Sequence, residues 1–247
     1  MWWPPFSDIS VIGDRQRTSN IERSIRPANG FLYHRHMTRA DSMMVAGAPL
    51  QWTPRLADLA ATADLLLAVD SGANHLARLG LRPAAVIGDL DSITAETRAW
   101  LGEDCMVHRP DQDRTDLDKA LEYAFDEIGV EQLTVLAALG GRTDHDLGNL
   151  GLLSRLAMGE RLTFEAADQT VLAVSGETSL AAVPGETWSF WTFDPSVQVT
   201  IDGVRWPVDS AALDPSNRPS ISNEAIAEEV RICASGGAVV VTRQVKG

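Results

Sequence analysis

The order in which short apolar runs and helical patterns follow one another constrains the fold of this chain most. Between residues 44 and 166, β-rich apolar runs alternate with segments whose apolar residues recur at helical spacing. This alternation is typical of a parallel sheet covered by helices. The predicted strands are residues 65–69, 85–87, 106–108, 133–139 and 162–165. A parallel α/β domain is therefore expected here.

The pattern changes near residue 170. The segments TVLAVSGET, ETWSFWTF, VQVTIDGVRW and EVRICASGGAVVVT are short alternating strands with turn signals between them, which is the pattern of a small antiparallel sandwich or barrel. A chain of 247 residues can bury one large core or two modest ones, and this change favours two. We predict three parts: an N-terminal extension of unclear structure (1–42), a parallel-sheet domain with covering helices (43–168) and a small all-β sandwich domain (169–247).

Charge and composition exclude several functional classes. A formal net charge of -13 works against nonspecific binding to nucleic acid or to an anionic membrane surface. No apolar run approaches the roughly 18 residues of a membrane span, and no basic region followed by an apolar stretch begins the sequence. Cys105 and Cys233 fit no metal-ligand spacing, which predicts ordinary buried thiols. We expect a cytoplasmic protein whose partners are small molecules.

Four aspartates lie where the predicted strands lead into turns, namely Asp70, Asp89, Asp91 and Asp116. The carboxyl ends of parallel strands meet at one edge of a sheet, where open α/β sheets bind their ligands. Because Mg²⁺ prefers hard oxygen ligands and keeps some of its water, this pattern predicts a magnesium site that handles a polyphosphate. A structural alternative stays open, since Asp89 and Asp91 in GDLDS can also bond the backbone amides of an Asx-turn.

One helix is predicted over residues 115–128. Its apolar residues fall on one face, and Thr115 with Asp118 has the spacing of a capping box. Asp116 then lies in the first turn, where the helix dipole stabilises a carboxylate by about 0.3 to 1 kcal/mol. A purely structural role is therefore also open for Asp116.

The segment LAALGGRTDHDLGN follows a predicted strand and opens a helix. Gly140 and Gly141 would let backbone amides approach a phosphate, and Arg142 adds a charged fork. The structural alternative is a glycine-rich turn before a capped helix. The chain has no GxxxxGK[ST] phosphate loop, and its two lysines are Lys119 and Lys246. Arginines and metal would therefore have to neutralise a polyphosphate.

In this order and spacing, the motifs resemble thiamine pyrophosphokinase. They are DSGANHL with a downstream GDLDS, then PDQDRTD, then GGRTDH followed by Asn149, and finally VTIDGVRWP with SISN. Each motif is weak alone, whereas the set is specific and covers about residues 44–243. The resemblance implies a homodimer with an α/β catalytic domain and a β-sandwich domain, which transfers the terminal diphosphate of ATP to the hydroxyl of thiamine and releases AMP.

The resemblance also implies roles for individual residues. The catalytic positions, which hold Mg²⁺, are Asp70, Asp89, Asp91 and Asp116. The positions near ATP and its phosphates are Gly88, Asp89, Thr115, Gly140, Gly141, Arg142 and Asp144. The thiamine positions are Gln112, Trp206, Ser220, Ser222 and Asn223. Those of the second domain are expected to be reached across the dimer interface.

One departure from the family and two other functions bear on this interpretation. The first motif of the family more often reads DGGA, and Ser71 is compatible with it if the backbone there keeps a negative φ. A related pyrophosphokinase that acts on a pterin alcohol is one alternative function. A catalytically silent thiamine or nucleotide sensor is the other. The VRWP and SISN segments favour thiamine, and the presence of all four acids favours an enzyme.

Overall fold

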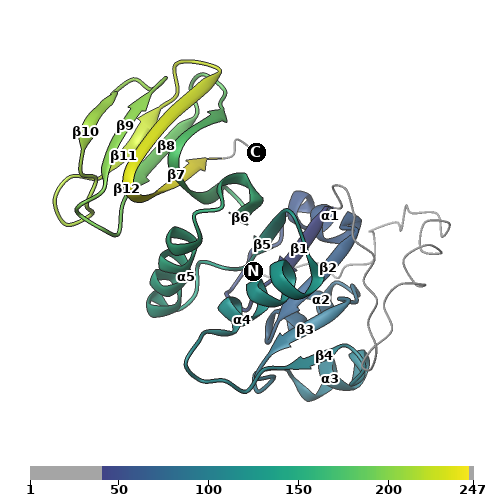
Figure 1. The fold of residues 1–247 in the computed structure, drawn as a ribbon. Helices are drawn as coiled ribbons and strands as arrows, with labels where there is room; N and C mark the ends of the chain where they lie inside the picture. The colour runs from purple at the N-terminus through teal and green to yellow at the C-terminus, as the bar shows by residue number, and fades with distance from the viewer. Residues whose placement is uncertain (1–40, 245–247) are drawn as a thin grey trace. The chain divides into compact units, whose positions relative to one another are not determined.

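The computed structural model describes residues 41–244, so the predicted N-terminal extension lies almost wholly outside the described residues. A sheet of 12 strands runs through the described part in the order β10-β9-β12-β7-β6-β5-β1-β2-β3-β4, with β8 paired to β12 and β11 paired to β8 (Figure 1). Strands β1 to β6 pair in parallel and form the parallel half of the sheet, whereas β7 to β12 pair antiparallel and form its antiparallel half. The predicted α/β fold with a following all-β domain is thus confirmed.

The parallel half alternates strands and helices. Its strands are β1 (Ser42–Val45), β2 (Leu65–Val69), β3 (Ala85–Gly88), β4 (Met106–His108), β5 (Leu133–Leu136) and β6 (Leu162–Glu165). Its α-helices are α1 (Pro54–Thr62), α2 (Gly72–Arg78), α3 (Ala95–Leu101), α4 (Asp116–Glu122) and α5 (Thr143–Leu156), and a 3-10 turn covers Gly159–Arg161. Three of the five predicted strands agree to the residue. The predicted strand at 133–139 ends early, because Ala137 takes a left-handed φ of 53°.

The central strand β1 was not found from the sequence. It lies between β2 and β5, and all four of its residues are buried. A strand buried on both faces shows no alternation of polar and apolar residues. Its sequence SMMV also has few of the β-branched residues that mark a strand.

The helix predicted over 115–128 is present but changes its winding. α4 covers Asp116–Glu122, and the next six residues (Tyr123–Ile128) form a π-helix that ends at Gly129. The Thr115 hydroxyl accepts the amide of Asp118 at 3.2 Å, as a capping box requires. The Asp118 carboxylate pairs with Arg155 at 2.7 Å. One of the two hydrogen bonds of the predicted capping box, from the amide of Asp118 to Thr115, is therefore present.

The antiparallel half is the predicted all-β domain. Its strands are β7 (Gln169–Ala181), β8 (Thr187–Trp191), β9 (Gln198–Asp202), β10 (Val208–Ala211), β11 (Ser220–Glu224) and β12 (Glu229–Gln244). A bulge in β12 between Ala234 and Ala238 lets its first part pair with β9 and its last part with β8. Trp188 and Phe190 are buried in the core of this half, with their rings stacked at 6.1 Å.

Strand β7 joins the two halves. It begins at Gln169, but its alternate residues belong to different cores. Val171 and Ala173 pack in the core of the parallel half, whereas Leu172 and Val174 pack in the core of the antiparallel half. A division after residue 168 therefore stays a prediction.

Two other expectations can be compared with the described residues. No helix within residues 41–244 is long and apolar enough to cross a membrane. Both cysteines are free, and Cys105 is half-buried. The expectation of a buried thiol is wrong for Cys233, because this residue lies on the exposed face of β12. A cytoplasmic location stays a prediction.

Candidate active site

Three of the four predicted acids converge at the carboxyl edge of the parallel strands. Asp70 follows β2, Asp89 follows β3, and Asp116 opens α4 after β4. Because β2, β3 and β4 are neighbours in the sheet, their ends bring these carboxylates together. One carboxylate oxygen from each of the three residues lies within 4.8 Å of the other two. We call Asp70, Asp89 and Asp116 the acid group.

Asp70 is the buried member of the acid group, with 7% of its surface exposed and a left-handed φ of 41°. Its amide donates to the carbonyl of Ile87 at 2.9 Å, and its carboxylate accepts the amide of Ser92 at 3.3 Å. Burial is the main cause that raises the pKa of Asp70, and the charge of Asp116 adds to it. The φ of Ser71 is −60°, a negative value with which serine at this position is compatible.

Gly88 makes room for the acid group. Its φ of 150° lies where side chains are rarely tolerated. A Cβ atom there would lie 3.1 Å from the Cβ of Asp70 and 3.2 Å from the carboxyl carbon of Asp116. A side chain at this position would therefore push the two acids apart.

The turn after β3 is both an Asx-turn and part of the acid group. The amide of Asp91 donates to the Asp89 carboxylate at 3.3 Å, and this bond is the main cause that lowers the pKa of Asp89. Gln112 approaches the other oxygen of Asp89 at 3.5 Å. Asp91 is exposed, lies outside the acid group, and accepts the hydroxyl of Ser92 at 2.7 Å. The Asx-turn and the predicted metal site are therefore compatible interpretations of GDLDS.

Lys119 lies against the acid group, although its sequence pattern predicted no role for it. Its side chain is 3% exposed, and its ammonium donates to Asp116 at 2.9 Å and to the carbonyl of Arg109 at 3.1 Å. The available signal was its spacing of three residues from Asp116 on one helix. That spacing is equally typical of a surface ion pair, so it could not show that the Lys119 side chain is buried.

The glycine turn before α5 is held by an acid. The amides of Gly140 and Gly141 donate to the carboxylate of Asp146 at 3.1 to 3.3 Å. Arg142 is exposed and forms two bonds to Asp144, at 3.1 and 2.6 Å, which lower the pKa of that acid. A phosphate that used the glycine amides would therefore have to replace Asp146.

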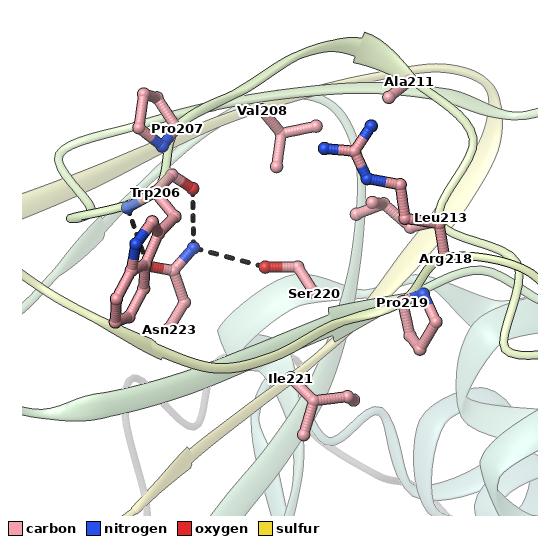
Figure 2. A pocket seen from close by; sticks show the side chains of 10 residues that line it. All are labelled: Trp206, Pro207, Val208, Ala211, Leu213, Arg218, Pro219, Ser220, Ile221 and Asn223. Atoms are coloured by element: carbon pink, nitrogen blue, oxygen red, sulfur yellow. Dashed lines mark hydrogen bonds between the residues drawn. The ribbon is translucent and has the colours of Figure 1, made fainter.

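A cavity of about 200 Å³ lies in the antiparallel half, and three of the residues predicted to bind thiamine line it (Figure 2). These three are Trp206, Ser220 and Asn223. Sequence reasoning missed Arg218, whose guanidinium reaches across the cavity toward Val208 and Ala211. The fourth predicted residue of this half, Ser222, is exposed, does not line the cavity, and bonds Ser189 through its amide at 3.0 Å.

Asn223 holds the wall of this cavity. Its side chain is buried, accepts the amide of Trp206 at 3.1 Å and donates to the carbonyl of Trp206 at 2.8 Å. It also donates to the hydroxyl of Ser220 at 3.2 Å (Figure 2). The Trp206 side of the cavity is thereby fixed, while Trp206 itself stays 58% exposed.

Asp70→Asn is expected to raise the thermal stability of the metal-free protein. The folded pKa of Asp70 is raised above its ordinary 3.8, so its ionised form destabilises the fold. This cost is absent below the unfolded pKa, grows as pH rises from the unfolded to the folded pKa, and is complete above the folded pKa. The gain in the variant should thus increase with pH and vanish toward about pH 3.

Melting curves without divalent ions measure this gain, which we expect to be about 2–4 °C. Asparagine tolerates a left-handed φ, so the backbone of the variant should be kept. Asp64→Asn is the matched control, because Asp64 is exposed and precedes the same strand that Asp70 follows. An unchanged or lower melting temperature for Asp70→Asn would contradict the assigned cost.

Comparison with known proteins places both halves in one family. The thiamin pyrophosphokinase catalytic domain matches residues 56–164, and the vitamin B1 binding domain of thiamin pyrophosphokinase matches residues 177–239. Thiamine pyrophosphokinase of Bacillus subtilis (strain 168) is 27% identical over 208 residues, which cover 81% of this chain and 96% of that protein. Thiamine pyrophosphokinase 1 of Oryza sativa subsp. japonica is 28% identical over 214 residues, which cover 75% of this chain and 78% of that protein.

The fold agrees with these matches. A crystal structure of thiamine pyrophosphokinase from Bacillus subtilis superposes with a TM-score of 0.69 at 25% identity, covering 83% of this chain and 99% of that one. The two matched domains follow each other in the order in which the parallel and antiparallel halves occur. This chain therefore belongs to the thiamin pyrophosphokinase family.

Proposed function

We propose that this chain transfers the terminal diphosphate of ATP to the hydroxyl of thiamine, giving thiamine diphosphate and AMP. The observation that carries this proposal is the acid group at the carboxyl ends of parallel strands, in a chain that both thiamin pyrophosphokinase domains match. Phosphoryl transfer requires positioning and charge neutralisation more than covalent chemistry from the protein. An acidic edge together with a separate acceptor pocket suits that requirement.

The acid group fits Mg²⁺. It offers three carboxylates, which are the hard oxygen donors that Mg²⁺ prefers, and two of the three are only partly buried. Asp70, Asp89 and Asp116 would hold the ion, and the exposed Asp91 at the same turn remains the fourth predicted ligand. When bound, Mg²⁺ would neutralise charge on the triphosphate oxygens.

Other residues would position ATP. Gly88 keeps the space between the acids open, and Thr115 caps the helix that carries Asp116. Arg142 presents an exposed guanidinium, which suits bidentate bonding to a phosphate. The amides of Gly140 and Gly141 would bind phosphate oxygens in place of Asp146, and Asp144 would hold Arg142 in orientation.

The thiamine residues divide into two places. Gln112 lies beside Asp89, so it would orient the acceptor at the acid group. The exposed ring of Trp206 offers a face for an aromatic, cationic ligand, and Ser220 adds a hydroxyl to the same cavity. Asn223 would act by holding Trp206, because its polar atoms already bond the backbone of that residue. Ser222 would contribute from β11, where its side chain is exposed.

The active unit that we propose is a homodimer in which the second domain of one protomer completes the site of its partner. The metal acids all precede residue 150 and the pocket residues follow residue 200, a division that a second subunit could bridge. Two-fold dimers are also the commonest oligomers. At thiamine concentrations well below the KM of Trp206→Ala, Asp116→Asn and Trp206→Ala chains should each be nearly inactive alone. Their mixture should then regain about a quarter of normal activity after subunit exchange, since half the dimers carry one intact site. No recovery despite proven exchange would contradict shared sites.

The direct test of the function is incubation of the purified chain with ATP, Mg²⁺ and thiamine, followed by chromatography. Thiamine diphosphate and AMP should form in equal amounts. Formation of ADP and thiamine monophosphate would contradict transfer of a diphosphate. A chain that binds both substrates without turnover would contradict the enzymatic function itself.

A further inference from the structure

Lys119 is a buried cation beside the acid group that the proposed mechanism does not use. Its ammonium is held on two sides, by the carboxylate of Asp116 and by the carbonyl of Arg109 at the end of β4. Buried lysines are rare unless they are paired. With 3% of its side chain exposed, it is too enclosed to contact a phosphate from solvent.

The bond to Lys119 determines which oxygen of Asp116 is free. The same Asp116 oxygen, Oδ1, accepts both the ammonium of Lys119 at 2.9 Å and the amide of Asp89 at 3.2 Å. This oxygen is therefore already occupied, and the other one is left for a ligand. Lys119 thus orients Asp116 within the acid group.

The charges of the acid group point to a second effect. Three carboxylates gather within 4.8 Å, and Lys119 supplies one positive charge in contact with them. That charge reduces the repulsion between the acids when no metal is present. The same charge repels a divalent cation that enters the group.

We propose that Lys119 is an internal counter-cation of the acid group, which orients Asp116 and keeps the affinity of the nucleotide-free protein for divalent metal low. Metal then binds chiefly together with the triphosphate, whose negative charge outweighs that of the lysine. This inference rests on the proposed function, because it takes the acid group as the metal site. Lys119 is accordingly a positioning residue, since it acts through Asp116.

Two opposing effects determine whether metal affinity rises or falls when the charge of Lys119 is removed. Loss of an ammonium a few ångströms from a divalent ion should tighten metal binding at least about tenfold, even at the dielectric constant of water. Loss of the orientation of one carboxylate should weaken binding by about fivefold or less. The charge effect is larger, so neutral variants should bind metal more tightly.

The test measures Mn²⁺ binding to the full chain without nucleotide, by the electron paramagnetic resonance signal of free Mn²⁺. Lys119→Met removes the charge and the hydrogen bond, and Lys119→Gln removes the charge but keeps a donor. Both should lower the Kd about tenfold or more, whereas Lys119→Arg should stay within about threefold of the wild type. Arg114→Met is the matched control, because Arg114 pairs with Asp111 and Glu122 outside the acid group.

Unchanged or weaker binding in folded Lys119→Met and Lys119→Gln overturns the inference. A neutral variant that folds only when Mn²⁺ is added supports it, and one that folds under neither condition shows a purely structural lysine and overturns it. Asp89→Asn distinguishes a failure of the metal-site assignment from a failure of the inference about Lys119. If this variant leaves Mn²⁺ binding unchanged, the acid group is not the metal site, and the inference about Lys119 fails with that assignment. If it weakens binding while the lysine variants do not tighten it, the inference about Lys119 alone fails.

Discussion

Asp116→Asn is expected to lower kcat at least about a thousandfold, while Asp118→Asn stays within about threefold of the wild type. Both acids lie in the first turn of α4, so the helix dipole affects them alike. They differ in what they contact. The Asp116 carboxylate belongs to the acid group, whereas the Asp118 carboxylate pairs with Arg155.

Steady-state turnover of ATP and thiamine at saturating Mg²⁺ measures this difference, and melting curves check that both variants fold. Equal, modest losses in the two variants would show that Asp116 serves only the helix terminus. The same assay applied to Asp91→Asn tests the fourth predicted ligand. A loss of orders of magnitude is expected there too, because Asp91 follows Asp89 closely enough to turn toward the bound ion.

Trp206→Ala should raise the KM for thiamine about thirtyfold and leave the KM for ATP within about twofold. The ring is exposed on the wall of the cavity, where it offers a stacking face, and it lies in the half of the chain that does not contain the acid group. Ile226→Ala is the matched control, since Ile226 is also an exposed apolar residue of this half but does not line the cavity. Its kinetic constants should stay unchanged.

The two KM values must be measured separately, each at saturation of the other substrate. An equal rise of both constants in Trp206→Ala would contradict a divided site. Asn223→Asp provides a second test of the same wall, because it loses the donor to the carbonyl of Trp206 and places a charge there. It should change the thiamine KM in the same direction as Trp206→Ala.

The acid group illustrates what could be read from local patterns. The runs before Asp70 and Asp89 are apolar and β-rich, and a carboxylate follows each run directly. In a parallel sheet with crossover helices, strand ends on one edge are neighbours as a rule of topology. Convergence of these acids could therefore be predicted from the alternation of strands and helices. The change from parallel to antiparallel strands near residue 170 could be predicted from the short alternating strands and turn signals that follow it.

Other features depend on contacts between segments that are far apart in the chain. β1 is central because β2 and β5 flank it, and four buried residues carry no periodic signal of that position. The enclosure of Lys119, the hold of Asn223 on Trp206 and the exposure of Cys233 likewise depend on which surfaces pack together. A repeat of apolar residues reports the period and the ends of an element, because these are local properties of the backbone. Burial and hydrogen-bond partners arise only when elements pack, so they had to come from the folded chain.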